Sequence, residues 1–131
     1  MTVFVTKRPT PDKKGWLPDL SPADKYGAKE FVFEGADRVF ALPAPSLHKA
    51  RRKIGARFDY RSDYLLHPNT MDQMALVNCL IAILEQNPPH INMLYYDRIQ
   101  QPDGSRNPRI GTYYPIRIDL RRPTQKVTEH E

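Results

Sequence analysis

Hydrophobic positions concentrate in residues 70–86, and Pro88-Pro89 follow them. At 100° per residue, the apolar side chains of this stretch cover one broad face and much of the remaining circumference. A capping-box pattern stands at its start, and the proline pair cannot continue a helix. We therefore predict a helix over 70–86 that is apolar nearly all round. It should be the most buried helix of the protein, with Leu80 and Ile83 almost fully enclosed.

Strand-like segments precede and follow this helix. Asp63–His67 has the length and composition of a short buried strand, and Ile91–Ile99 carries apolar residues on both faces. Together the three segments have the length of a right-handed βαβ crossover, whose strands are parallel. Tyr113–Leu120 is predicted to be the return strand of a C-terminal hairpin. Pro115 within it favours a position at the edge of the sheet.

The first half of the predicted domain is less regular. Phe31–Glu34 and Arg38–Leu42 are rich in Val and Phe, and the turn residues between them favour a hairpin. A helix with a narrow apolar stripe is predicted from Pro45 to about Gly55. The elements together predict an α/β (or α+β) domain over residues 28–122. Its architecture is a small mixed β-sheet with two helices, one βαβ unit and a C-terminal antiparallel hairpin.

Two further segments flank that domain. Residues 1–27 hold closely spaced prolines, and the chain has 13 prolines in 131 residues, about twice the usual share of roughly 5%. Proline favours extended chain, so we predict that this segment is an arm. It carries Trp16 and Leu17, which we expect to dock on this chain or on a neighbour. Residues 123–131 form a polar tail.

Composition excludes several classes of protein. The longest uninterrupted apolar run, Cys79–Leu84, is far shorter than the roughly 20 residues of a membrane span. The N-terminal residues lack the apolar stretch of a secretory signal. A single cysteine permits neither an internal disulfide nor a cysteine-based zinc site, and we expect Cys79 in the core. We expect no cofactor and no metal, and a location in the cytoplasm or in a particle assembled there.

Basic residues outnumber acidic ones by 20 to 15, which gives a net charge of +5. Residues 47–61 hold six basic residues against one acidic, and residues 98–122 hold six against two. Such clusters are typical of a phosphate path for nucleic acid, although a basic helix face in solvent has the same pattern. The residues that we predict to bind nucleic acid are Lys49, Arg51, Arg52, Lys53, Arg57, Arg98, Arg106 and Arg109.

Tyrosine doublets accompany the second basic window, one on each strand of the predicted C-terminal hairpin. Aromatic side chains with interleaved arginines can stack nucleic-acid bases, and they are also enriched at protein interfaces. Ordinary packing on a sheet explains many tyrosines of this kind as well. The residues that we predict to bind a protein partner or a second copy are Trp16, Leu17, Tyr96 and Tyr113.

Catalytic signals are weak. His67 and Asp72 could act as a general base and its orienting carboxylate, but a helix start explains the polar residues here more simply. Asp97 and Asp119 could face each other across the last hairpin and hold Mg²⁺. Exposed carboxylates paired with arginines explain them more simply too. No histidine spacing is typical of a zinc site, and we assign no catalytic residue.

Three functions remain open at this point. The first is a non-enzymatic basic module that contacts nucleic acid within a nucleoprotein or viral-type particle. The second is a structural or interaction subunit of a larger assembly, which docks or self-associates through its proline-rich arm. The third, with the least support, is a small hydrolase or nuclease-like enzyme. We expect no membrane partner.

Overall fold

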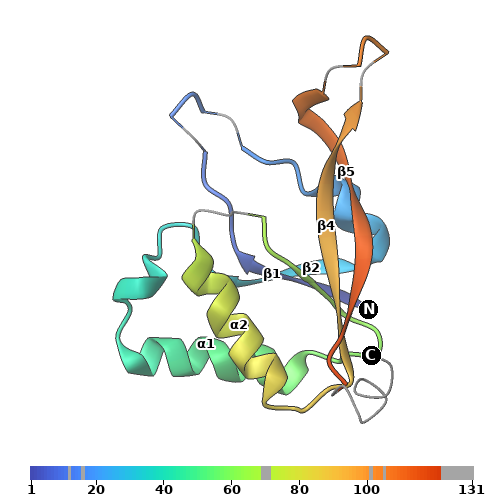
Figure 1. The fold of residues 1–131 in the computed structure, drawn as a ribbon. Coiled ribbons are helices and arrows are strands. Elements are labelled where there is room, and N and C mark those ends of the chain that lie inside the picture. The colour runs from blue at the N-terminus through green and yellow to red at the C-terminus, as the bar shows by residue number, and fades with distance from the viewer. Residues whose placement is uncertain (12, 16, 69–71, 101, 105, 122–131) are drawn as a thin grey trace, which may run out of the picture.

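In the part of the chain that the structure describes, a five-stranded sheet is the centre of the fold (Figure 1). The structure is a computed structural model that describes residues 1–11, 13–15, 17–68, 72–100, 102–104 and 106–121, without the side chains of 98–100 and 106–110. The strands are β1 (Thr2–Lys7), β2 (Ala28–Phe33), β3 (Tyr64–Leu66), β4 (His90–Gln100) and β5 (Arg106–Asp119). Their order is β2-β1-β3-β4-β5, and only β5 runs antiparallel to its neighbour.

Two α-helices cover one face of this sheet, and a 3-10 helix lies on the other face (Figure 1). The elements are α1 (Ala44–Arg57), α2 (Gln73–Leu84) and the 3-10 helices η1 (Ser21–Tyr26), on the second face, and η2 (Val39–Ala41), before α1. No helix in the described ranges is long and apolar enough to cross a membrane.

The two α-helices begin in different ways. Pro43 and Pro45 flank Ala44, the first residue of α1. Proline fits at this position because an N–H group in the first turn of a helix has no helical acceptor. α2 starts after Asp72, whose side chain accepts a hydrogen bond from the Ala75 amide at 3.4 Å. A charged side chain therefore caps α2, whereas α1 relies on the backbone preference of proline.

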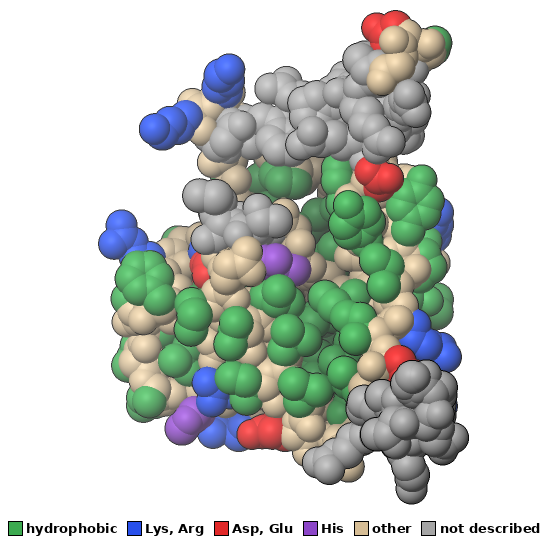
Figure 2. Space-filling model, viewed as in Figure 1, with side chains coloured by type: hydrophobic (Ala, Val, Ile, Leu, Met, Phe, Trp, Pro, Cys, Tyr) green, Lys and Arg blue, Asp and Glu red, His purple; other side chains and the backbone are tan. Residues whose placement is uncertain are grey.

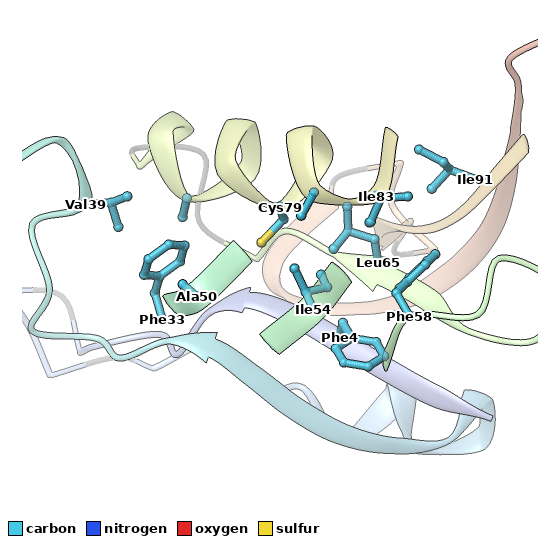
Figure 3. Close-up of a cluster of buried hydrophobic side chains, with 12 residues drawn as sticks. Phe4, Phe33, Val39, Ala50, Ile54, Phe58, Leu65, Cys79, Ile83 and Ile91 are labelled. Atoms are coloured by element: carbon cyan, nitrogen blue, oxygen red, sulfur yellow. The ribbon is translucent and has the colours of Figure 1, made fainter. Parts of the chain in front are cut away.

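Strand side chains alternate between two cores. In β1, Phe4 faces the α-helices, whereas Val3 and Val5 face η1. The larger core joins the helices to the sheet, and Figure 3 shows Ile83 of α2 pointing toward Leu65 of β3. Both cores contain residues of β1 and β3, so these two strands are buried on both faces and form the centre of the molecule.

The predicted fold class is confirmed. The structure is a mixed α/β fold with a five-stranded sheet, two main helices and a C-terminal antiparallel hairpin of β4 and β5. β3, α2 and β4 form the predicted βαβ unit, with β3 and β4 parallel. Pro115 lies in β5, which is an edge strand, as the presence of this proline predicted.

The predicted hairpin of residues 31–34 and 38–42 is wrong. Phe31 belongs to β2, which pairs in parallel with β1, and Val39 belongs to a 3-10 helix. The reason is that two segments could pair with β2, namely residues 38–42 and the N-terminal strand β1. β2 pairs with β1 because this strand is buried on both faces. Val39, 1% exposed, then packs into the larger core instead of pairing with β2.

Residues 1–27, expected as an extended arm, divide into three parts in the structure. Residues 2–7 are the central strand β1, residues 8–20 lack regular structure where described, and η1 packs on the sheet through Ala23. Pro22 fits the first turn of η1, which explains how a proline-rich segment forms helical structure. Only the middle part corresponds to the predicted arm, and removing residues 1–25 would remove a core strand.

The burial of α2 differs from the prediction in one respect. Ile83 is 0% exposed, as predicted, but Leu80 is only partly buried. The sheet covers one side of α2 and α1 flanks it, so the side that faces away from both has no cover from the described residues. A helix that is apolar nearly all round therefore presents an apolar side to solvent.

Candidate docking surface

The solvent side of α2 is an apolar stripe. Met74, Val77, Ile81 and Leu84 are 36–48% exposed. Their spacing of three, four and three residues is that of the a and d positions of a heptad, the pattern by which one helix packs on another. A surface helix normally presents polar residues to water. This side of α2 therefore has the pattern of an interface without a partner inside the described chain.

The β4–β5 hairpin extends the same surface. Ile116 stands opposite Met93 and Ile118 stands opposite Ile91 in the strand register. Because Ile91 and Met93 pack on the helix-facing side of the sheet, their β5 partners face that side too, and both are at least 40% exposed. Further along the hairpin, Tyr95 and Tyr114 stand opposite each other and are 55% and 49% exposed.

Figure 2 shows apolar side chains gathered on one side of the molecule, over α2 and across to β4 and β5. Counted over whole residues, the exposed area of the α2 stripe and the hairpin residues named above is roughly 700 Å², and the largest apolar patch of a typical monomer covers roughly 300–600 Å². We name this surface the apolar face, and its residues are Met74, Val77, Ile81, Leu84, Tyr95, Tyr114, Ile116 and Ile118.

The basic residues of α1 are divided between contacts within the chain and solvent. Arg51 Nε donates to Asn78 Oδ1 of α2 at 2.9 Å, and Lys53 Nζ donates to the Phe31 carbonyl oxygen at 2.9 Å. Arg57 forms an ion pair with a β2 side chain, Glu30, at 2.8 Å. Three of the five predicted phosphate contacts on α1 therefore also hold this helix to its neighbours.

Lys49 and Arg52 remain exposed on the solvent side of α1. A groove of about 480 Å³ runs between α1 and α2 and is lined by Arg51, Arg52 and Glu85, among others. The carboxylate of Glu85 weakens the attraction of this groove for phosphate. Arg98 lies on β4, and Arg106 and Arg109 lie on β5, but their side chains are outside the description.

The predicted partner-binding residues lie in different environments. Tyr113 is 3% exposed and packs against Tyr96 at 5.2 Å between ring centroids, and burial raises the pKa of Tyr113 to about 12. Leu17 is 48% exposed beside Phe31 in a shallow pocket, and Trp16 lies outside the described residues. The binding role of these residues stays a prediction, and Tyr113 is covered by its own chain.

A polar group lies where the carboxyl ends of β1 and β3 meet. Thr6 Oγ1 and His67 Nδ1 are 2.7 Å apart, and Lys7 Nζ donates to Asp72 Oδ2 at 2.6 Å. Burial lowers the pKa of His67, although the charge of Asp72 acts in the opposite direction. Asp72 also caps α2, so one of its carboxylate oxygens accepts from the helix and the other accepts from Lys7. Among the described contacts, none joins Asp72 to His67, so the predicted orienting role is not seen.

Other candidates for chemistry are separated or buried. Asp97 stands opposite Thr112, whereas Asp119 stands opposite His90 at the far end of the hairpin, so the two carboxylates do not share an ion. In the described ranges no group of three His, Cys, Asp or Glu residues could hold a metal. Cys79 is 1% exposed and burial raises its pKa to about 12, which confirms it as a core residue rather than a nucleophile.

Sequence reasoning missed the apolar face, although its signal was present. The predicted helix 70–86 has more apolar side chains around its axis than packing against a single core needs. From the sequence alone, these additional apolar residues are attributed to deeper burial of the helix. The spacing of Met74, Val77, Ile81 and Leu84 already had the heptad pattern of a second contact side.

The comparison with protein families gives a match. A family model described as "Phage Pam3 gp32-like protein" matches residues 1–120. Comparisons with curated proteins and with solved structures give no match.

Proposed function

The chain belongs to the phage Pam3 gp32-like protein family, and on this premise we propose that it is a non-enzymatic interaction subunit of a phage assembly. Its apolar face docks on a protein surface that presents a complementary apolar helix. The assembly forms in the cytoplasm of the host, and the chain acts inside it as a connector between protein subunits.

One observation carries this proposal, the exposed heptad stripe of α2. Val77 and Ile81 at its centre are 41% and 36% exposed, although residues of this type are usually buried. Exposed apolar area reduces solubility, and its cost is removed when a partner covers it. A helix partner fits better than nucleic acid here, because the stripe between Asp72 and Glu85 contains no charged side chain for a phosphate.

A second candidate function is contact with nucleic acid through α1. It is supported by the exposed side chains of Lys49 and Arg52, which face away from the core. Arg51, Lys53 and Arg57 support it less, since each is engaged within the chain. The two functions use different helices, so substitutions can separate them. Docking through the proline-rich arm, predicted over residues 1–27, stays a separate prediction.

The test compares phages that encode variants of this chain. Ile81→Glu puts a charge at the centre of the apolar face, and burying an unpaired carboxylate there disfavours docking strongly. We expect the yield of infectious particles to fall about tenfold or more. The double variant Lys49→Gln with Arg52→Gln should leave the yield unchanged. Thermal unfolding of the purified variants confirms that each one folds.

Two results would count against the proposal. A normal yield with Ile81→Glu shows that the apolar face is not needed for assembly. A reduced yield with the α1 double variant alone favours the nucleic-acid function instead.

A further inference from the structure

We propose that the occupant of the apolar face is a second copy of this chain, with the two α2 helices packed antiparallel about a two-fold axis. The inference rests on the proposed function, because it names the partner of the same surface. The arrangement is isologous, so each copy presents the same residues to the other.

The stripe on α2 is symmetric about the middle of the helix. An axis at the level of residue 79 places Met74 opposite Leu84 of the second copy and Val77 opposite Ile81 of the second copy. One two-fold axis therefore pairs all four exposed side chains, with none left over. Met74 and Leu84, both long side chains, then meet at the two ends of the interface. The β-branched side chains of Val77 and Ile81 meet at its centre, as in the contact between two helices of a coiled coil.

Charge is compatible with this pairing. Each chain has a net charge of +5, but the stripe itself is uncharged from Gln73 to Leu84, so no like charges meet at the centre of the interface. Antiparallel packing also sets the C-terminal end of each helix beside the N-terminal end of the other. The opposite partial charges of the helix ends then attract each other.

The area of the apolar face is close to that of one side of a standard interface. The apolar face exposes roughly 700 Å² on each copy, and each partner of a standard interface contributes roughly 800 Å². The α2 stripe supplies the centre, and the apolar side chains of the β4–β5 hairpin lie to one side of it (Figure 2).

The β5 edge of the sheet offers a less suitable route to a dimer. β5 is one of the two edge strands, and strand-to-strand pairing of two copies through it would need its outward amide groups. Pro115 in the middle of this strand has no N–H, and proline on an edge strand opposes such pairing. The apolar faces of two molecules therefore meet more readily than their β5 edges.

Analytical ultracentrifugation of the full chain tests the inference, at concentrations up to about 100 µM to detect micromolar dissociation constants. We expect the parent to have twice its 15.2 kDa mass at high concentration. Ile81→Glu should be a monomer throughout. Ser46→Glu adds the same charge at an exposed position of α1 and should remain a dimer.

Cysteine cross-linking tests the orientation. An equimolar mixture of Val77→Cys and Ile81→Cys should form a disulfide between the two variants under mild oxidation. Either variant alone should form it more slowly, because each new thiol faces the other position across the axis. Fast cross-linking of Val77→Cys alone would indicate parallel helices and overturn the antiparallel arrangement. The native Cys79 is buried and should not compete.

The outcomes distinguish this inference from the function on which it rests. A parent that is monomeric at every concentration overturns the second copy as partner. If Ile81→Glu nevertheless lowers phage yield, the interaction function stands and another protein occupies the face. A dimer that persists in Ile81→Glu uses a different surface and also overturns the inference.

Discussion

Helices α1 and α2 lie side by side on the same face of the sheet, yet their solvent sides are opposite in character. α1 presents Lys49 and Arg52 to water, whereas α2 presents Val77 and Ile81. One apolar side is enough to attach a helix to its own core, so the second apolar side of α2 does not serve that attachment. In the proposed function, the solvent side of α1 stays in water, whereas the solvent side of α2 docks on a partner.

The largest expected effect separates the two sides of α2 itself. Ile83 is 0% exposed in the larger core, whereas Ile81 is 36% exposed. Ile83→Ala should lower the free energy of unfolding by about 2–5 kcal/mol, because it leaves a cavity. Ile81→Ala should change it by less than about 1 kcal/mol in dilute protein. Urea denaturation measures both, and equal losses would mean that α2 has no open side.

The next effect concerns the start of α2. Asp72→Ala removes the cap on the Ala75 amide and the ion pair with Lys7, whose side chain is 12% exposed. We expect a loss of about 1–2 kcal/mol in unfolding free energy. Asp72→Asn keeps a capping oxygen and should lose less. A smaller loss for Asp72→Ala than for Asp72→Asn would contradict the capping role.

A pH effect follows from His67. Burial lowers its pKa in the folded protein below the ordinary 6.5, so the unfolded chain binds a proton more readily. The free energy of unfolding should fall as pH drops below about 6.5 and should be constant above it. His67→Asn should flatten this profile, measured by urea denaturation across pH 5–8. His48→Gln, at an exposed position of α1, serves as the control, and a parent profile that rises toward low pH would refute the assignment.

The smallest expected effect is on the solvent side of α1. Changing Lys49 and Arg52 together to Gln should shift the unfolding free energy by only a few tenths of a kcal/mol, since exposed like charges repel weakly. If α1 contacts phosphates, the same change should make the slope of log binding constant against log salt concentration shallower by about two. If the double variant binds nucleic acid as the parent does at every salt concentration, the solvent side of α1 does not contact phosphates.

Periodicity predicted the elements that have strong local signals. The strand at 63–67, the helix ending before Pro88 and the C-terminal hairpin are present as β3, α2 and the β4–β5 pair. Pro115 correctly indicated an edge strand, because a missing N–H excludes a central position. These predictions depend on neighbouring residues only, so no knowledge of distant segments was needed.

Predictions failed where a distant segment changed the outcome. Residues 28–33 pair with β1, about 26 positions earlier in the chain, instead of with their neighbours at 38–42. Thr2–Lys7 lay within the predicted arm of residues 1–27, yet it is the strand with which both β2 and β3 pair. Its importance comes from parallel pairing on two sides, which short-range pattern does not encode.

The sequence by itself determined which residues are apolar on α2, how they are spaced and where the charge of the chain lies. It did not determine which of those apolar residues the fold would bury. Only the tertiary structure decided that Ile83 is buried against the sheet while Ile81 is exposed to solvent, and that the β5 isoleucines belong to the same apolar face. The physical reason is that burial depends on what lies opposite a side chain in space, whereas periodicity states only which side chains share a direction.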